Sequence, residues 1–247
     1  MKKICLLFVC LLFAVGSPAV ADEMVSVKLG YQMLSPSGTF AGETAGVGTA
    51  IDMEDDLNFD DSKDMTAEVA LQFGNGRLSL GYTPLDFSGT GTGTYDFNGK
   101  NFTGAVKGEV SADIYDIGFT YYLLNLDDIP ARLQLGLELA VKVFDGEASL
   151  DSLVLPKEVV SGTAPIPTVG VRTRVALADF IGLVGRIGYL EYDGNSFLDA
   201  EAQVEISPLP LVGIYAGYRI FDLSVDEADL VLDVEFSGPF AGALVRF

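Results

Sequence analysis

The sequence of 247 residues contains no histidine and no tryptophan, and both of its cysteines, Cys5 and Cys10, lie within the first ten residues. Beyond Cys10 the chain therefore forms no disulfide and offers no thiolate to a metal ion. Without histidine, it cannot run a hydrolytic mechanism in which an imidazole acts as the general base. We therefore expect no enzymatic activity and no cofactor.

Positive charge is also scarce. The chain has 15 Lys and Arg against 35 Asp and Glu, a formal net charge of −20, which excludes binding of nucleic acid through a basic patch. The chain is nevertheless 49% hydrophobic with a mean hydropathy of +0.35, more apolar than a soluble or disordered protein of this charge usually is. Both properties fit one molecule if the apolar side chains face lipid and the charged ones face water.

One apolar run stands at the N-terminus, and no long run follows it. Lys2 and Lys3 precede the apolar residues 4–15, and Ala19-Val20-Ala21 supplies a small-x-small cleavage motif. We therefore predict a cleaved signal peptide at 1–21 and a mature domain at 22–247. Because no later run reaches about 18 apolar residues, a membrane-spanning helix is excluded. A closed β-barrel is then the structure that can span a bilayer, since lipid offers no partners to open backbone groups.

Strict alternation of apolar and polar residues supports the barrel. In 132–144 one face carries Leu and Val at every odd position from 133 to 143, whereas a helix would put Glu138 and Lys142 among the leucines. About ten alternating residues suffice for a tilted strand to cross a bilayer. The pattern recurs at 25–32, 67–73, 78–82, 115–123, 169–177, 181–189, 198–206, 212–220 and 241–247.

These ten segments predict an all-β fold, a transmembrane antiparallel up-and-down barrel. Ten strands are preferred, with eight or twelve as the alternatives, and a soluble β-sandwich is the competing architecture. Short turns are expected near 75, 126, 178 and 208, on the periplasmic side. Polar connections at 35–63, 89–108, 146–163, 193–196 and 222–229 are expected outside the cell, and the Gly- and Thr-rich stretch 89–104 is expected to be a flexible external loop.

Aromatic residues near the predicted strand ends indicate the girdles that mark membrane interfaces. They are Tyr31, Phe73, Tyr82, Tyr115, Tyr121, Phe144, Tyr189, Tyr218 and Phe247. Phe247 also closes an amphipathic terminal segment, which is typical of the signal that the outer-membrane assembly machinery recognises. We expect a monomer whose partners are that machinery, outer-membrane lipid and lipopolysaccharide.

Several short segments resemble a family of small Gram-negative outer-membrane barrels of unassigned function. They are Ile51-Asp52-Met53-Glu54-Asp55-Asp56-Leu57, Tyr192-Asp193-Gly194-Asn195-Ser196, Ala216-Gly217-Tyr218-Arg219 and Phe236-Ser237-Gly238-Pro239-Phe240. The order of the segments matches over nearly the whole mature chain. Asn58 and the short turn Gly74-Asn75-Gly76 depart from the pattern. The resemblance implies a barrel in the outer membrane, and it brings no catalytic or binding residues.

Nine charged residues fall on the predicted inner faces of the strands. They are Glu138, Lys142, Arg172, Arg174, Arg186, Asp199, Glu201, Glu205 and Arg219. Neighbouring strands lie about 4.8 Å apart, so opposite charges can pair across the ladder. The favoured interpretation is a structural or surface protein whose lumen is largely closed by salt bridges, and the alternative is a narrow channel for small polar or ionic solutes. Leu137→Arg, on the lipid face, should then destabilise far more than Lys142→Ala.

The first predicted loop is acidic. Its carboxylates Asp52, Glu54, Asp55 and Asp56 could hold Ca²⁺ or Mg²⁺, but they lack the spacing of an EF-hand loop. A solvated acidic loop is the favoured interpretation, and binding of a cation or surface ligand by the loops is the third functional alternative. A carboxylate pair could also act as acid and base, yet the acidic residues of the inner faces are matched by arginines.

Overall fold

The computed structural model describes residues 25–42, 50–126, 132–178, 180–209, 211–227 and 230–247; the predicted signal peptide lies outside them. No described segment forms a helix long and apolar enough to cross a membrane. The strands are β1 (Val25–Gly42), β2 (Ile51–Asp52), β3 (Ser62–Phe73), β4 (Gly76–Phe97), β5 (Lys100–Leu126), β6 (Arg132–Ser152), β7 (Glu158–Ala178), β8 (Ile181–Tyr192), β9 (Asn195–Ile206), β10 (Val212–Glu227) and β11 (Leu230–Arg246).

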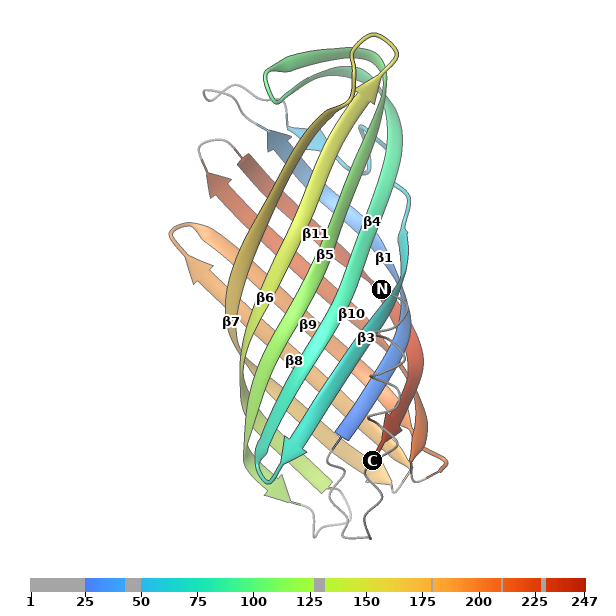
Figure 1. Cartoon of the computed structure of the whole chain (residues 1–247), viewed down its shortest axis with the longest axis vertical. Coiled ribbons are helices and arrows are strands. Elements are labelled where there is room, and N and C mark those ends of the chain that lie inside the picture. Colours follow the sequence, from blue (N-terminus) through green and yellow to red (C-terminus); the bar gives the residue numbers. More distant parts are fainter. Residues whose placement is uncertain (1–24, 43–49, 127–131, 179, 210, 228–229) are drawn as a thin grey trace, which may run out of the picture.

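The strands close into a barrel. Each long strand pairs antiparallel with its neighbour in sequence, and β11 returns to pair with β1, for example Leu29 with Ala243. The two-residue strand β2 pairs with β1 next to this ring of ten long strands. The ten-strand up-and-down antiparallel barrel predicted from the sequence is confirmed (Figure 1).

The alternation of side chains is also as predicted. On β6, Leu137 and Leu139 are exposed on the outside while Glu138 and Lys142 are buried inside. The outer surface is a band of exposed apolar side chains from many strands, among them Leu29, Leu80, Ile117, Phe119, Leu137, Leu139, Val169, Ile187 and Ile214. Such a band suits lipid, because it buries apolar surface without hydrogen-bonding demands.

Three predicted loops are largely strands, since β10 also continues through 222–227. β4 and β5 run through 89–108 and turn at Asn98 and Gly99, and β6 and β7 cover most of 146–163. Both turn residues have positive φ, 48° and 73°, as in the two-residue type I′ turns that join β-hairpins. The Gly- and Thr-rich stretch is therefore not a flexible loop, because its backbone stays paired in the ladder. In Figure 1 the ends of β4 to β7 extend beyond the other strands.

The two ends of the barrel differ. Val25 and Phe247 lie together at one end, called here the terminal end, and the hairpin turn at 98–99 lies at the other, called the far end (Figure 1). The short turn at 74–75 belongs to the terminal end, as predicted, and β7 and β9 also end there while β8 and β10 begin there. The turn expected near 126 falls largely on 127–131, outside the described residues.

Phe144 corrects one aromatic assignment. Its ring packs edge-on against Phe197 with centroids 5.4 Å apart, beside the apolar cluster inside the barrel. The residue has an even number on a strand whose odd residues face outward, so the alternation itself excludes it from an outer girdle. The other eight predicted girdle residues are exposed.

Candidate functional site: the barrel interior

The interior of the barrel has two layers. Charged side chains fill the half toward the terminal end, and apolar side chains fill the half toward the far end. Of the nine charged residues predicted to face inward, Glu138, Lys142, Arg172, Arg186, Asp199, Glu205 and Arg219 are buried, and Arg174 and Glu201 line interior cavities.

Asp199 on β9 is the centre of the main charge network. Its Oδ2 accepts hydrogen bonds from Arg186 Nη2 at 2.9 Å and Arg219 Nη2 at 3.2 Å, and it lies 2.7 Å from Lys142 Nζ. Lys142 also pairs with Asp116 on β5, whose Oδ2 lies 3.1 Å from Arg186 Nη1. These residues come from β5, β6, β8, β9 and β10, so the network bridges the lumen from wall to wall.

Two further carboxylates complete this network. Glu138 Oε1 lies 3.8 Å from Arg186 Nη1, and its Oε2 accepts a hydrogen bond of 2.9 Å from Thr120. Glu201 Oε2 lies 3.7 Å from Arg186 Nη2. Arg186 therefore faces four carboxylates, and removal of any one of them leaves the guanidinium paired.

A second group of charges lies nearer the terminal end and centres on Glu205. Its Oε1 lies 3.1 Å from Lys28 Nζ, and its Oε2 pairs with Arg246 and lies 3.5 Å from Arg174 Nε. Gln203 donates a further hydrogen bond of 2.9 Å to Oε1. One carboxylate is thus shared by three cations.

Sequence reasoning missed several members of these groups. Asp116, Lys28 and Arg246 occupy inward positions of β5, β1 and β11, and Glu68 on β3 pairs with Arg77 on β4 at 2.8 Å. The alternation alone could have found Lys28, Glu68, Asp116 and Arg246, since each lies between two apolar residues of the opposite face. Arg172 is placed inside as predicted, but no described carboxylate lies within the 4.0 Å of an ion pair with it.

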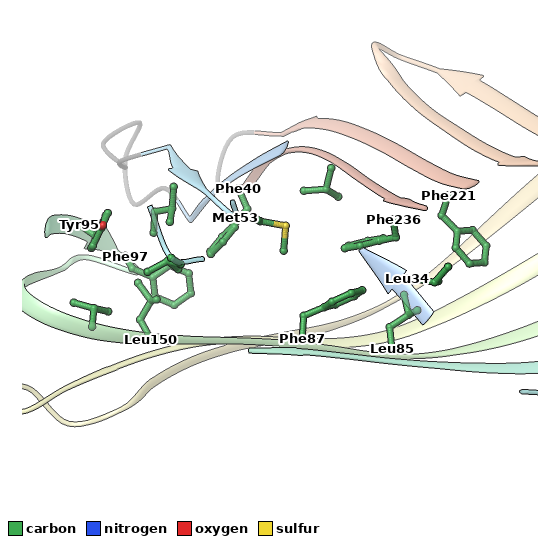
Figure 2. Close-up of a cluster of buried hydrophobic side chains, with 14 of the residues drawn as sticks. Leu34, Phe40, Met53, Leu85, Phe87, Tyr95, Phe97, Leu150, Phe221 and Phe236 are labelled. Atoms are coloured by element: carbon green, nitrogen blue, oxygen red, sulfur yellow. The ribbon is translucent and has the colours of Figure 1, made fainter. Parts of the chain in front are cut away.

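The far half of the lumen is an apolar cluster that the sequence did not reveal (Figure 2). Its buried members come from most of the barrel and from the first loop: Leu34, Phe40, Ile51, Met53, Leu57, Leu85, Phe87, Tyr95, Phe97, Phe102, Val106, Ile114, Leu150, Phe197, Phe221, Val234 and Phe236. Phe87 stacks on Phe236 with ring centroids 4.8 Å apart. The rings occupy the space that a polar channel would need.

The first loop turns into the barrel and contributes to this cluster. Backbone hydrogen bonds hold it to the wall, from Met53 N to Gly38 O at 3.0 Å and from Asp60 N to Ser88 O at 2.9 Å. Gly91 makes room for it, because a Cβ there would lie 1.8 Å from Asp56 O. Glycine at 89 and 91 is thus explained by close backbone approach, not by flexibility.

Two acidic side chains of this loop accept hydrogen bonds from its own backbone. Asp52 Oδ1 accepts from the N–H of Glu54 and Asp55 at 2.9 and 2.8 Å, and Asp56 Oδ2 accepts from Asp52 N at 2.9 Å. Asp52 and Asp56 therefore stabilise a turn, as such side chains commonly do. Across the described residues no group of three or more acidic, His or Cys side chains gathers as a metal site.

Arg219 lies at the boundary between the charged layer and the apolar layer and contacts both. The guanidinium of Arg219 lies over the ring of Phe221 at 4.1 Å while it pairs with Asp199. A planar guanidinium can stack on an aromatic face and still donate in its own plane. The charged and apolar layers therefore meet without an open gap at this point.

Cavities border both groups of charges in the described part of the barrel. One of about 60 Å³ borders the main network, and one of about 50 Å³ lies toward the terminal end. Since a cavity needs about 10–15 Å³ for each water molecule, each of these cavities holds a few waters. Neither volume approaches that of a pocket for a drug-sized ligand, about 300–1,000 Å³.

Phe247 forms the last backbone hydrogen bonds between β11 and β1. Its N–H donates to Val25 O at 2.8 Å, and its carbonyl accepts from Val25 N at 3.2 Å. Its side chain is exposed on the outer surface. The terminal residue is therefore part of the β11–β1 closure, with its ring available to lipid or protein.

Outside the barrel wall, the extended part of β5 carries an ion cluster. Glu109 accepts from Lys107 Nζ at 2.6 Å and from Lys157 Nζ at 2.7 Å. These hydrogen bonds lower the pKa of Glu109 to about 2. The carboxylate is stabilised in its charged form because two ammonium groups hold it.

Comparison with known proteins shows similarity at the level of the fold. The outer membrane protease OmpT from Escherichia coli is 10% identical, with a TM-score of 0.59 over 94% of this chain and 99% of OmpT. Ail, the attachment invasion locus protein of Yersinia pestis, is 10% identical, with a TM-score of 0.38 over 91% of this chain and 99% of Ail. Neisserial surface protein A is 12% identical, with a TM-score of 0.36 over 93% of this chain and all of that protein. No protein-family model matches the sequence, and no curated protein matches it.

Proposed function

We propose that this chain is an integral outer-membrane β-barrel with a closed lumen, and that its role is structural or exerted at the cell surface. Its closed antiparallel barrel, with an apolar outer band, is the architecture of outer-membrane proteins. Both halves of the lumen are filled, one by salt-bridged side chains and the other by packed aromatic rings.

The single observation that carries this proposal is the apolar cluster of the far half. A conducting lumen needs a continuous polar path, and here Phe87, Phe197, Phe221 and Phe236 are all buried across the path. A hydrophobic constriction stops ions by excluding water. The cluster argues against the alternative of a narrow channel more strongly than the ion pairs do, because charged networks can also line a pore.

Location, processing and partners follow from the same proposal. Residues 1–21 act as a signal peptide that is cleaved on export, and the mature barrel at 22–247 is a monomer in contact with outer-membrane lipid and lipopolysaccharide. Phe247 presents the assembly signal. The chain belongs with the small outer-membrane barrels that its Asp-Asp-Leu and Gly-Pro-Phe segments resemble, and it is not an enzyme.

Planar-bilayer recording tests the closed lumen. Purified barrel should insert without producing conductance steps, while a porin inserted under the same conditions supplies the positive control. Steps that disappear in Arg172→Ala/Arg174→Ala would instead establish the channel. Flotation of the protein with liposomes checks insertion, so that an absence of conductance steps can be attributed to a closed lumen.

A further inference from the structure

The cavity of about 50 Å³ near the terminal end is strongly cationic. Its wall comes from nine of the ten long strands and includes five basic side chains but one acidic side chain, that of Glu205. The basic residues are Lys28, Arg77, Arg172, Arg174 and Arg246. The cavity beside the main network differs, because Lys28, Arg186 and Arg219 there face Glu68, Asp116 and Glu201.

The one carboxylate of this cavity is already shared. Glu205 pairs with Lys28, Arg174 and Arg246, so it compensates a fraction of the positive charge around it. Taking cations out of water is costly unless opposite charge accompanies them. Basic side chains therefore outnumber acidic ones in the lining of a space that has room for a small solute.

Two of these arginines are buried, and one of them has a donor without a partner among the described residues. Arg77 is 6% exposed, and its Nη2 donates to Glu68 Oε1 at 2.8 Å, while its buried Nη1 has no hydrogen-bond partner among the described residues. Arg172 is 5% exposed, and no described carboxylate forms an ion pair with it. A buried donor such as Arg77 Nη1 normally has an acceptor, so it indicates a missing one.

We propose that this cavity binds a small tetrahedral oxyanion of the phosphate or sulfate class. The Nη1 of Arg77 and the guanidinium of Arg172 donate to its oxygens, and the remaining cations hold its charge. Arginine suits this task because its planar fork matches the oxygens of such an anion. The volume equals that of about three to five waters, the space of one such anion. The site goes beyond the proposed function, since it could be occupied in a closed or a conducting barrel.

Calorimetric titration with inorganic phosphate tests the site. The full mature chain is held in lipid-free detergent at neutral pH and constant ionic strength, and sodium chloride serves as the comparison titrant. We expect saturable binding of phosphate, and Arg172→Gln should weaken it about tenfold or more, the effect of losing a charge-assisted hydrogen bond. Arg132→Gln, which removes an exposed arginine at the start of β6, should change it less than about twofold.

Absence of saturable phosphate binding by the wild-type barrel would overturn the proposal, and so would equal binding by Arg172→Gln and wild type. Heat-modifiable gel mobility shows whether Arg172→Gln is folded. If it is not, Arg77→Lys and Arg172→Lys keep the charge but lose the fork, and unchanged binding by both would count against the site.

Side-chain NMR of the arginines gives a second readout, because phosphate should shift the Arg77 and Arg172 signals and leave the Arg132 signal in place. Bilayer conductance is measured separately, so the failure of either proposal is visible by itself.

Discussion

Lys142 is 1% exposed, and its ammonium group lies between the carboxylates of Asp116 and Asp199. A lumen-facing residue of a water-filled barrel would tolerate replacement, and the sequence led us to expect a small cost for Lys142→Ala. The structure reverses that expectation, because the substitution strips a shared partner from two buried carboxylates.

We therefore predict that Lys142→Ala lowers the free energy of unfolding by about 1.5–3 kcal/mol, the usual contribution of hydrogen bonding to a charged group, since Arg186 still pairs with both carboxylates. Urea-induced unfolding from liposomes, followed by tyrosine fluorescence, measures it. Lys107→Ala is the matched control, since its pair with Glu109 is exposed and such pairs contribute about 0–1 kcal/mol. Equal effects of the two substitutions would refute the packed network.

Leu137 lies on the outer surface and is 52% exposed. We predict that Leu137→Arg costs about 2–4 kcal/mol near the bilayer midplane, since a guanidinium there leaves water for hydrocarbon. Leu153→Arg is the control, because Leu153 is 97% exposed and lies in the connection after β6, away from the apolar band. The same unfolding experiment compares them, and a neutral Leu137→Arg would mean that this face does not meet lipid.

At the scale of elements, the fit of the first loop against β4 depends on Gly91. We predict that Gly91→Ala destabilises the barrel by about 1–3 kcal/mol, as overpacking does, because the new Cβ would collide with Asp56 O. The loop should also become more sensitive to added protease. Gly162→Ala is the control, since a Cβ there meets nothing within 4 Å. Unchanged protease sensitivity in Gly91→Ala would show that the loop does not occupy the lumen in solution.

The extended hairpins beyond the membrane have their own pH dependence. The pKa of Glu109 is lowered to about 2 from an ordinary 4.5, so its ion cluster is fully formed above pH 4.5 and is lost as the pH falls toward 2. NMR titration of the Glu109 carboxyl carbon measures this. Lys157→Ala should move the pKa back toward 4.5, because one of the two donors is gone. An ordinary pKa in the unaltered chain would mean that the lysines do not hold the carboxylate.

At the scale of the whole molecule, the pairing of β11 with β1 closes the ten long strands into a ring. We predict heat-modifiable mobility on a detergent gel, in which the unheated barrel migrates faster than the boiled chain because it stays compact. The mature chain should also require detergent or lipid to stay monodisperse. A freely soluble monomer without either would contradict the membrane assignment.

The lengths of the external hairpins show where pattern reasoning stops. Polarity and glycine content made 89–108 look like a loop, yet Asn98-Gly99 is a type I′ turn signal in its middle, and Thr residues favour strands. The Asn-Gly turn signal indicated a hairpin, but the glycine and polar content of 89–108 led us to predict a loop. The charged inner residues are a different case, since alternation places Glu138 and Lys142 inside but cannot say which carboxylate meets which cation.

The sequence by itself determined the class of fold and the side of the wall on which the strand residues lie, and it favoured ten strands over eight or twelve, because period-two alternation is a local property of a strand. The tertiary structure decided what fills the lumen. Strand register and barrel tilt bring Asp116, Lys142 and Asp199 to one height, and the inward turn of the first loop creates the apolar cluster. The cationic cavity arises in the same way, since residues from nine strands meet there and no local pattern records their meeting.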